Sequence, residues 1–405
     1  MVSKSLDGAT FIKDLEIRDK VIFLRVDFNV PIKDGVIQDD FRIQAAVPTI
    51  KYALSEGAKI VIGTHFGRPE PGNYDQPEFS LEPVAAKLGE LLGLDVLLVA
   101  DPLSDTPKAL LTMVKDNKVI MLENLRFNAS ETKNGDQLVN AIKNYIDIYV
   151  NDAFGASHRA HESIVALPKE ITTRAYGMLI KKEVEMLDHV LHNPEAPYVA
   201  ILGGAKVSDK IEIIDNLIDK VDCFIIGGAM AYTFLEAKGL QVGKSLVEVE
   251  KLTFARKFLK RVEVRGIKLL LPIDHLTLPS FNSPIDQLKK SPGPNIDGDE
   301  MGLDIGPKSR ELFMNEIIKA KTVFWNGPMG VFEKEGLSEG TFAIAKAMSE
   351  CGGITVVGGG DSAAAAKVSG YAEAFSHIST GGGASLEYLQ GAALPGLRAL
   401  RGKFN

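Results

Sequence analysis

Short runs of β-branched and aliphatic residues alternate along the chain with longer stretches whose apolar positions recur at helical spacing. The runs lead into the segments VIFLRVDFNVP, KIVIGTHFGRP, DVLLVADP, KVIMLENLRF and DIYVNDAFGASHRAH in the first half, and YVAILGGAKVSDK, DCFIIGGAMAYTF, KLLLPID, TVFWNGPMGVFE, GITVVGGGDSA and FSHISTGGGAS in the second. Such alternation is typical of β-α-β units that build a parallel sheet. The pattern predicts an α/β protein in which each half forms a doubly wound, Rossmann-like parallel sheet.

One amphipathic stretch, at about residues 178–193, separates the two sets of runs. Its apolar spacing favours a helix that ends near Asn193 and Pro194, because proline cannot continue a helix. A chain of 405 residues also exceeds the ~250–300 residues at which a single core divides. We therefore predict an N-terminal domain at 1–175 and a C-terminal domain at 176–389 that includes this interdomain helix. Because no low-complexity linker lies between them, we expect an ordered hinge.

Charge and cysteine content exclude several classes of protein. The chain carries 46 basic and 53 acidic residues, a formal charge of −7, which argues against a general binder of nucleic acid or membrane surfaces. The N-terminus lacks the apolar region of a signal peptide, and no apolar run approaches the ~18 residues that span a bilayer, so a cytoplasmic protein is expected. Cys223 and Cys351 form no C-x-x-C pair, which disfavours a disulfide framework or a zinc site.

The residues that follow the apolar runs differ between the two halves. The first half places polar and cationic side chains there: Asp27, Asn29, His65, Arg68, Asn124, Arg126, Asn151, His158 and Arg159. The second half places glycines there: Gly203, Gly204, Gly227, Gly228, Gly358, Gly359, Gly360, Gly381, Gly382 and Gly383. Ligands of open parallel sheets bind at the carboxyl ends of the strands. Arginine forks suit carboxylates and phosphates, and glycine turns before helices suit phosphates, so we predict two different anion sites.

The glycine turns leave more than one ligand open. No G-x-x-x-x-G-K-[ST] motif is present, but GGGDSA at Gly358–Ala363 fits the G-x-G-x-x-[GA] pattern of dinucleotide-binding enzymes. Such enzymes place an acidic residue about 20 positions later, where this chain has Thr380 and Gly381. Asp361 would repel a bare phosphate but suits a Mg²⁺-nucleotide, with a helix N-cap as the alternative.

Charged side chains elsewhere also have simpler explanations. Lys206 and Lys210, four residues apart, could reach the same phosphates from one helix face or form a solvated pair. A lone arginine is most often a surface residue, so the case for a cationic pocket depends on several lying at strand ends. His158 and His161 in HRAHE do not match H-E-x-x-H, and zinc binding there is disfavoured. Phosphoryl transfer needs only positioning and charge neutralisation, and these residue types meet that need.

Taken together, the motifs RVDFNVP, THFGRP, LENLRF, NDAFGASHRAH, GGAKVSDK, WNGPMGVFE, GGGDS and STGGGAS closely resemble those of the phosphoglycerate kinase family. They occur in the family's order and cover nearly the whole chain. The resemblance implies reversible, Mg²⁺-dependent phosphoryl transfer from 1,3-bisphosphoglycerate to ADP, giving 3-phosphoglycerate and ATP, in glycolysis and gluconeogenesis. It further implies a monomeric enzyme, direct in-line transfer after hinge closure, and a C-terminal segment, about 390–405, that packs on the N-terminal domain.

The resemblance also implies roles for individual residues. It assigns the acid substrate to Asp27, Phe28, Asn29, Arg42, His65, Phe66, Gly67, Arg68, Arg126 and Arg159. It assigns the nucleotide to Gly203, Gly204, Lys206, Lys210, Gly227, Gly228, Leu303, Asn326, Pro328, Glu333, Gly359, Gly360, Asp361 and Ser362, with Asp361 as the Mg²⁺ ligand and Glu333 at the ribose. The implied catalytic set is Arg42 and Lys206, which bracket the transferring group, with Gly382 and Gly383 at a helix N-terminus.

Two other classes of protein stay open from the residues alone. A nicotinamide-dependent oxidoreductase would bind NAD(H), which a spectrophotometric titration detects. A non-catalytic nucleotide-binding regulator would require damage to the implied catalytic set, yet Arg42, Lys206, Lys210 and Asp361 are all present.

Overall fold

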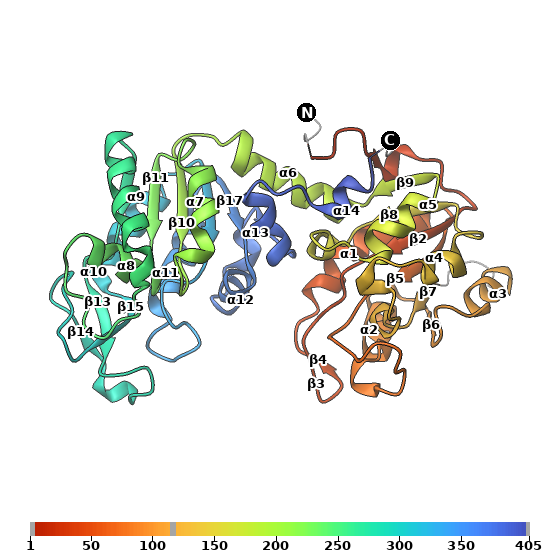
Figure 1. The fold of residues 1–405 in the computed structure, drawn as a ribbon, viewed down its shortest axis with the longest axis horizontal. Coiled ribbons are helices and arrows are strands. Elements are labelled where there is room, and N and C mark those ends of the chain that lie inside the picture. The colour runs from red at the N-terminus through yellow and green to blue at the C-terminus, as the bar shows by residue number, and fades with distance from the viewer. Residues whose placement is uncertain (1–4, 114–118, 402–405) are drawn as a thin grey trace. The chain divides into compact units, whose positions relative to one another are not determined.

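The computed structural model describes residues 5–113 and 119–401. The described residues separate into two compact units. Those up to Glu185, together with those from Ala392 onward, form unit 1, and Met186–Gly391 form unit 2. Each unit is built around its own parallel sheet, which confirms the predicted α/β class with two doubly wound domains (Figure 1). Across these described residues, no helix combines the length and hydrophobicity needed to cross a membrane.

Unit 1 contains a seven-stranded sheet in which every neighbouring pair of strands is parallel. Its strand order is β1 (Thr10–Phe11), β9 (Thr173–Tyr176), β8 (Ile148–Asn151), β2 (Val21–Arg25), β5 (Lys59–Gly63), β7 (Val119–Leu122) and β6 (Val96–Val99). A separate hairpin pairs β3 (Ile32–Lys33) with β4 (Val36–Ile37). The central strands are buried on both faces, so their sequences read as continuous apolar runs rather than as an alternating pattern.

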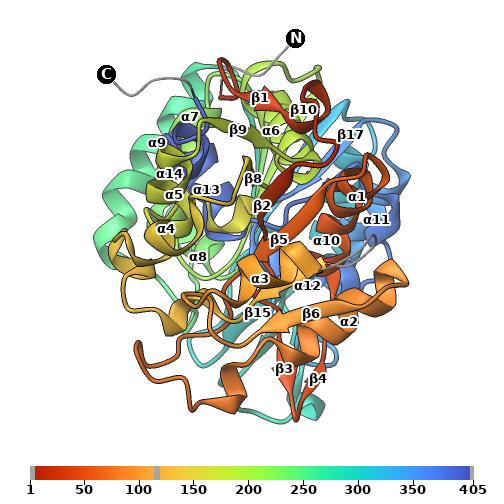
Figure 2. The same cartoon turned by 90° about the vertical axis from the view of Figure 1, so that its right-hand side faces the viewer.

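Helices cover both faces of this sheet, as Figure 2 shows. They are α1 (Phe41–Ser55), α2 (Glu82–Leu92), α3 (Thr106–Met113), α4 (Gln137–Ile142), α5 (Leu167–Glu170) and α14 (Pro395–Arg398). Helices α1 and α2 share one buried core with Ile22 and Leu24 of β2. Successive strand residues point to opposite faces, and Phe23 accordingly stacks on Tyr149 of β8, with 5.9 Å between ring centroids.

Helix α6 (Met178–His192) contributes residues to both units. In unit 1, Asp152 and Thr49 accept hydrogen bonds from the first turn of the helix, at Ile180 N (3.1 Å) and Met178 N (3.0 Å). In unit 2, His189 lies 3.4 Å from the Thr322 hydroxyl. The units therefore divide within α6, whereas the sequence analysis placed the whole helix in the C-terminal domain.

The C-terminal segment from Ala392 to Arg401 is part of unit 1. The Gly396 N–H donates to Ser157 O at 2.8 Å, and the Arg401 guanidinium donates to Ser5 O at 2.7 Å. A Cβ on Gly396 would lie 2.9 Å from the Ser157 backbone, so this contact requires glycine. Residues 402–405 of the predicted 390–405 segment lie outside the described residues.

Unit 2 contains a six-stranded parallel sheet. Its strand order is β12 (Lys268–Leu270), β11 (Cys223–Ile226), β10 (Tyr198–Leu202), β16 (Thr322–Asn326), β17 (Ile354–Val357) and β18 (His377–Ile378). The helices are α7 (Ile211–Leu217), α8 (Met230–Ala237), α9 (Leu252–Val264), α10 (Pro307–Ile317), α11 (Glu339–Glu350), α12 (Gly360–Val368) and α13 (Gly383–Leu389). Phe258 of α9 joins β11 to α8, because its ring contacts Phe224 and Phe234 at centroid distances of 5.4 and 5.5 Å.

A smaller antiparallel sheet in unit 2 was not predicted from the sequence. It has the order β14 (Lys289–Lys290), β13 (His275–Leu278) and β15 (Met301–Ile305). A separate core of Leu276, Leu278, Leu303 and Leu337 lies against it. This sheet carries Leu303 next to the segment that follows β16.

Candidate active site

In unit 1, the segments that follow β2 and β5 are tied to the start of α1. Arg42 donates from Nη1 to Asn29 O at 2.9 Å, and the same nitrogen lies 3.4 Å from Asp27 Oδ2. The Asn29 side chain in turn accepts a hydrogen bond from Gly67 N at 3.0 Å. The structure thus brings Asp27, Asn29 and Gly67 to one edge of the sheet, as their positions after parallel strands predict, and joins Arg42 of α1 to them.

Arg126 lies at the same edge, at the end of β7. Its guanidinium donates to Gly67 O, and only 7% of the residue is exposed. The turn that carries it is fixed by Asn124, whose side chain bonds to Phe66 N (3.0 Å), Phe66 O (2.7 Å) and Arg126 N (3.2 Å). This arrangement fixes the Arg126 backbone before any ligand arrives.

A third arginine, Arg25, lies behind this edge and is fully buried. It donates from Nε to Ser163 Oγ at 2.7 Å, and its Nη2 lies 3.3 Å from His65 Nδ1. The Ser163 hydroxyl in turn donates a hydrogen bond to Glu131 Oε1 at 2.7 Å, and the same oxygen lies 3.8 Å from Arg25 Nη2. Sequence reasoning missed Arg25 because it falls inside an apolar run, and missed Glu131 because it follows no strand.

The electrostatics of this edge favour an anion. Burial first, and then the charges of Arg25, Arg126 and Arg159, hold the pKa of His65 well below its usual 6.5. Burial and the same arginines lower the pKa of His161 to about 3. The pKa of Arg126 falls to about 10, chiefly through burial and then through repulsion by Arg159. Several cations therefore share one site beside neutral histidines, and an anionic ligand would relieve their mutual repulsion.

Other predicted substrate residues occupy different surroundings. Phe28 is fully buried and Phe66 is 9% exposed, so both rings belong to the core and only their backbone is near the edge. Arg68 is exposed beside Gly67. Arg159 is half-buried, and its Nε lies 3.2 Å from the His158 ring. Among the residues that the structure describes, no group of three potential metal ligands forms around His158 and His161 or elsewhere.

In unit 2, the glycines after β10 and β11 pack against the segment that follows β16. Gly203 N donates to Asn326 O at 2.9 Å, Gly204 N to Pro328 O at 2.9 Å, and Gly228 N to Met329 O at 3.0 Å. A Cβ on Gly203 would lie 2.2 Å from Pro328 O, so any larger residue would collide with backbone. These N–H groups are occupied within the protein, which makes the glycines a close-packed surface and not a set of phosphate donors.

Donors suited to phosphate lie instead around the start of α12. Gly359 has a φ of +94°, and α12 begins at Gly360, so the peptide N–H groups of its first turn lie at a helix N-terminus. Ser362 accepts a hydrogen bond from Gly327 N at 2.6 Å, while Asp361 is exposed at the same turn. The hydrogen bond between Gly327 and Ser362 thus connects the loop after β16 to the start of α12, which follows β17.

Lys210 lies beside this turn and donates to the Asn326 side chain. Burial lowers its pKa, an effect that Asp209 and Asp361 oppose. Asn326 in turn donates to Gly358 O at 2.5 Å. Lys206, four residues earlier, is exposed. The two predicted lysines therefore lie on one short segment: Lys210 is hydrogen-bonded to Asn326, whereas the exposed Lys206 can reach a ligand.

Two carboxylates that the sequence analysis did not predict fix the backbone of this site. Glu248 accepts hydrogen bonds from Val207 N, from Ser208 N at 3.1 Å and from the Ser208 hydroxyl at 2.7 Å, which fixes the turn between the two lysines. Asp304, next to Leu303, accepts from Ile305 N and Gly340 N, both at 2.8 Å. Glu248 lies 40 positions from Ser208, and Asp304 lies 36 positions from Gly340, so no local motif marks either pairing.

The loop that carries Glu333 is held at both ends. Val331 N donates to Leu303 O at 3.0 Å near its start, and Gly340 N donates to Asp304 near its end. Burial raises the pKa of Asp304 to about 7. Glu333 itself is exposed, as a contact to a bound ribose would require.

Gly382 and Gly383 stand at the start of α13. Gly382 has a φ of +46°, a conformation that favours glycine, and α13 begins at Gly383. Gly381 N donates to Ser379 Oγ at 3.1 Å and so fixes the approach to the helix.

A cationic sheet edge in one unit and a helix N-terminus with a carboxylate and a lysine in the other define a two-domain phosphotransferase, which moves a phosphoryl group between an anionic substrate and a nucleotide. The family model described as phosphoglycerate kinase matches residues 12–392. The chain is 52% identical over 400 residues to a phosphoglycerate kinase of Bdellovibrio bacteriovorus, covering 99% of both chains, and 48% identical over 394 residues to one of Clostridium perfringens, covering 97% of this chain and 98% of the other.

Solved structures agree with these relatives. The phosphoglycerate kinase of Coxiella burnetii matches with a TM-score of 0.86 at 37% identity, over 97% of this chain and 98% of the other. That of Pyrococcus horikoshii matches with a TM-score of 0.82 at 34% identity, over 96% of this chain and 98% of the other. The chain belongs to the phosphoglycerate kinase family.

The family's reaction follows: the enzyme transfers a phosphoryl group from 1,3-bisphosphoglycerate to ADP, giving 3-phosphoglycerate and ATP in glycolysis, with Mg²⁺ as cofactor. The residues around α12 fit that ion, because one exposed carboxylate, Asp361, stands at a helix N-terminus suited to phosphates. Mg²⁺ commonly takes one or two carboxylates and completes its shell with substrate phosphates and water. The dehydrogenase and the non-catalytic regulator are therefore set aside.

Proposed function

We propose that unit 1 binds the acid substrate and unit 2 the Mg²⁺-nucleotide. The observation that carries this proposal is the concentration of Arg25, Arg126 and Arg159 around the neutral His65 in unit 1. A phosphoglycerate carries both a carboxylate and a phosphate, and arginine forks match both groups. Unit 2 offers a close-packed glycine surface for the nucleoside and helix N-termini for its phosphates.

In the proposed mechanism, a β-phosphate oxygen of ADP attacks the acyl phosphorus of 1,3-bisphosphoglycerate. The new P–O bond forms as the bond to the carboxyl oxygen breaks, and 3-phosphoglycerate leaves as a carboxylate, so no proton and no covalent enzyme intermediate are needed. Arg42 and Lys206 neutralise the charge on the transferring group, and Gly382 and Gly383 offer peptide N–H groups to it. Bound Mg²⁺ would neutralise the nucleotide phosphates next to Asp361.

Transfer requires that the two ligands meet without water, so the proposal includes the hinge closure predicted from the sequence. The hinge candidates are the helix at about 178–193 and the segment His377–Thr380. As a glycolytic enzyme of this family, the protein is proposed to act in the cytoplasm.

A coupled assay of 3-phosphoglycerate-dependent ATP consumption tests the assignment of the acid substrate. Arg126→Ala should raise the KM for 3-phosphoglycerate by at least about tenfold, because a charge-assisted pair in a desolvated site is lost, and leave the KM for Mg-ATP nearly unchanged. Arg18→Ala, an exposed arginine in the same unit, is the matched control and should change neither value. A selective loss of nucleotide affinity in Arg126→Ala would refute the assignment.

A further inference from the structure

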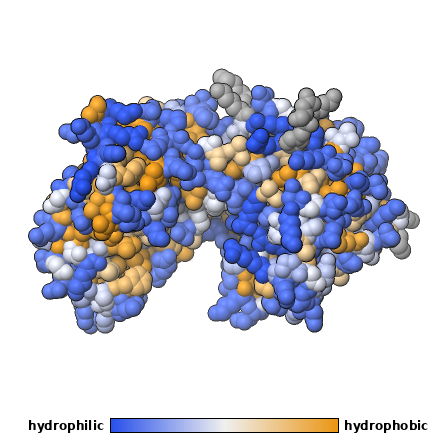
Figure 3. Space-filling view, in the orientation of Figure 1, coloured by the Kyte–Doolittle hydropathy of each residue, from blue (hydrophilic) through white to orange (hydrophobic). Residues whose placement is uncertain are grey.

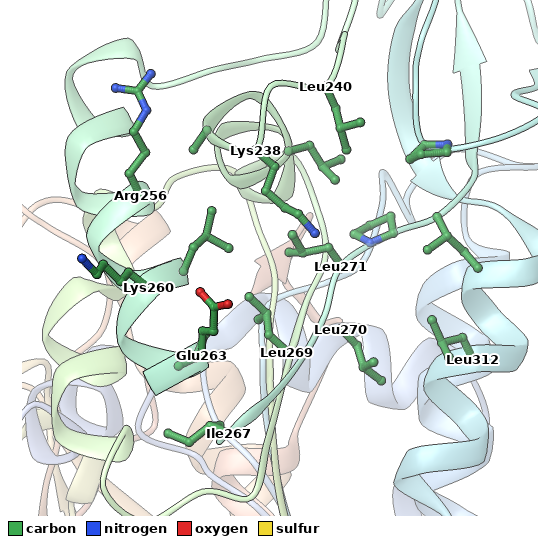
Figure 4. Close-up of a pocket in the computed structure, with 17 residues that line it drawn as sticks. Lys238, Leu240, Arg256, Lys260, Glu263, Ile267, Leu269, Leu270, Leu271 and Leu312 are labelled. Carbon is green, nitrogen blue, oxygen red and sulfur yellow. The ribbon is translucent and has the colours of Figure 1, made fainter. Parts of the chain in front are cut away.

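Unit 2 contains a groove of about 990 Å³ that none of the predicted site residues lines. We call it the β12 groove, because it lies beside the edge strand β12 and is walled by α8, α9, α10 and the segment Leu271–Ile273 (Figure 4). In the space-filling view, hydrophobic side chains gather over the part of unit 2 where α8 and α9 lie (Figure 3). The predicted nucleotide residues instead follow β10, β11, β16 and β17 or, for Leu303, lie in β15, so the groove is a separate feature of the unit.

The lining of the β12 groove is aliphatic. Its side chains include Leu240, Leu259, Ile267, Leu269, Leu271 and Leu312, and none of the described residues that line it is aromatic. No glycine turn lines it either. A nucleobase would therefore find no ring to stack on, whereas an alkyl chain could bury its methylenes against the leucines.

Cations at the rim of the groove favour a negatively charged ligand. Lys238, Arg256 and Lys260 line the groove and are exposed, and no carboxylate lies within 4.0 Å of their nitrogens among the described residues. By contrast, two other arginines on or next to α9 are neutralised: Arg261 by Asp215 at 2.5 Å and Arg265 by Asp219 at 2.9 Å.

The cations differ in direction. In Figure 4, the Lys238 side chain extends toward Leu271, while Arg256 and Lys260 project from α9 at the outer rim. The one acid of the lining, Glu263, lies a turn further along α9. A ligand headgroup that carries negative charge would therefore be placed near Lys238 and away from Glu263.

From this combination we propose that the β12 groove binds a single-chain amphiphilic anion, namely an alkyl carboxylate whose chain covers the leucines and whose headgroup pairs with Lys238. The occupant is argued from the matching of charge and shape: Lys238 extends over a floor of aliphatic side chains (Figure 4), and the described lining as a whole carries three cations against one acid. The site is independent of the kinase reaction, because no residue assigned to either substrate contributes to it.

Isothermal titration calorimetry of the full chain with octanoate, decanoate and dodecanoate, each below its micelle concentration, tests the apolar half of the proposal. Burial of each additional methylene should tighten binding about fourfold, which gives a steep dependence on chain length. The dodecanoate isotherm should be unchanged in the presence of saturating Mg-ADP. Absence of saturable binding, an affinity independent of chain length, or displacement by Mg-ADP would overturn the proposal.

Substitution of Lys238 tests the proposed ion pair with the ligand headgroup. Lys238→Gln should weaken dodecanoate binding about three- to tenfold at low salt and less at high salt, because an exposed pair is screened. Lys257→Gln, at an exposed lysine of α9 that does not line the groove, is the control and should bind like wild type. Retained kinase activity in both variants verifies that they fold. Equal binding of dodecyltrimethylammonium and dodecanoate would contradict the assigned charge, as would saturable binding of an acidic amphipathic peptide with none of dodecanoate.

Discussion

The two units have the same kind of sheet but opposite chemistry at the carboxyl ends of its strands. In unit 1 the strand ends carry charged and amide side chains that are mostly buried, among them Asp27, His65 and Arg126. In unit 2 they carry glycines whose backbone packs against neighbouring loops, as Gly203 does against Pro328. One parallel sheet can thus present either side chains or backbone to a ligand, and the few residues after each strand decide which.

The units also differ in how they stabilise their sites. Unit 1 buries a hydrogen-bonded ion network in which Arg25 reaches Glu131 through Ser163. Unit 2 instead leaves two charged groups of its site, Lys206 and Asp361, exposed and fixes the surrounding backbone. Disruption of unit 1 should therefore affect stability and substrate binding together, whereas changes in unit 2 should affect the nucleotide more selectively.

The largest expected effect comes from Arg42, which is assigned to the transferring phosphoryl group. Arg42→Ala should lower kcat about 10²- to 10³-fold, because charge on that group is greatest in the transition state. The affinity for Mg-ADP should stay nearly unchanged in calorimetry. Lys51→Ala, an exposed lysine on the same helix, serves as the control. Near-normal turnover in Arg42→Ala would remove it from the catalytic set.

Asp361 is expected to produce the next largest effect. Asp361→Ala should weaken Mg-ADP binding about ten- to one hundredfold in calorimetry, because the metal loses its protein carboxylate. Binding of 3-phosphoglycerate alone should change little. The control is Glu373→Ala, another exposed acid of unit 2. If the loss fell on 3-phosphoglycerate instead, the ligand assignment of the units would be reversed.

Stability should depend on pH through His161. Its pKa is about 3 in the folded chain against an ordinary 6.5, so the unfolded state binds a proton first as the pH falls. The free energy of unfolding should accordingly drop by up to about 1.4 kcal/mol for each pH unit below 6.5, with the loss levelling off near pH 3. His161→Gln should remove that share of the slope in denaturant titrations. His192→Gln, at an exposed histidine, should not.

The comparison of the two variants isolates this effect from titrations of opposite sign. Burial raises the pKa of Asp152 and of Asp304 to about 7, so their contribution to stability is lost as the pH rises from about 4 through 7. A slope in His161→Gln equal to that of wild type would show that His161 does not stay neutral in the folded protein.

The smallest expected effect concerns Asp304, a positioning residue for the loop with Glu333. Asp304→Asn keeps one acceptor for the two N–H groups of Ile305 and Gly340, and should raise the KM for Mg-ATP about three- to tenfold while the KM for 3-phosphoglycerate stays the same. Asp299→Asn, a fully exposed acid of the same unit, is the control. Equal changes in both KM values would indicate a general loss of folding rather than a positioning role.

Much of the fold could be predicted from the sequence because buried parallel strands leave continuous apolar runs, such as VIML of β7. The antiparallel sheet of β13, β14 and β15 could not, because its strands are short and β14 consists of two exposed lysines. The strand-end residues were likewise open to prediction, since parallel topology alone places Asp27 and Gly67 at one edge.

The sequence did not reveal the hydrogen bonds and ion pairs between residues that lie far apart along the chain. Arg25 lies within an apolar run, and its buried guanidinium donates a hydrogen bond to Ser163 and forms an ion pair with Glu131, both more than 100 positions away. Glu248 binds Ser208 across 40 positions, and Asp304 binds Gly340 across 36. Pairings of this kind follow from the folded topology and leave no local pattern.

Hydrogen exchange of the full chain with each ligand alone tests most directly the claim that each unit binds its own substrate. Saturating 3-phosphoglycerate should slow exchange at peptides that contain residues 25–29, 65–68 and 124–127 in unit 1. Saturating Mg-ADP should slow it at residues 358–363 in unit 2. Protection of 358–363 by 3-phosphoglycerate, together with protection of the arginine edge by Mg-ADP, would contradict the account.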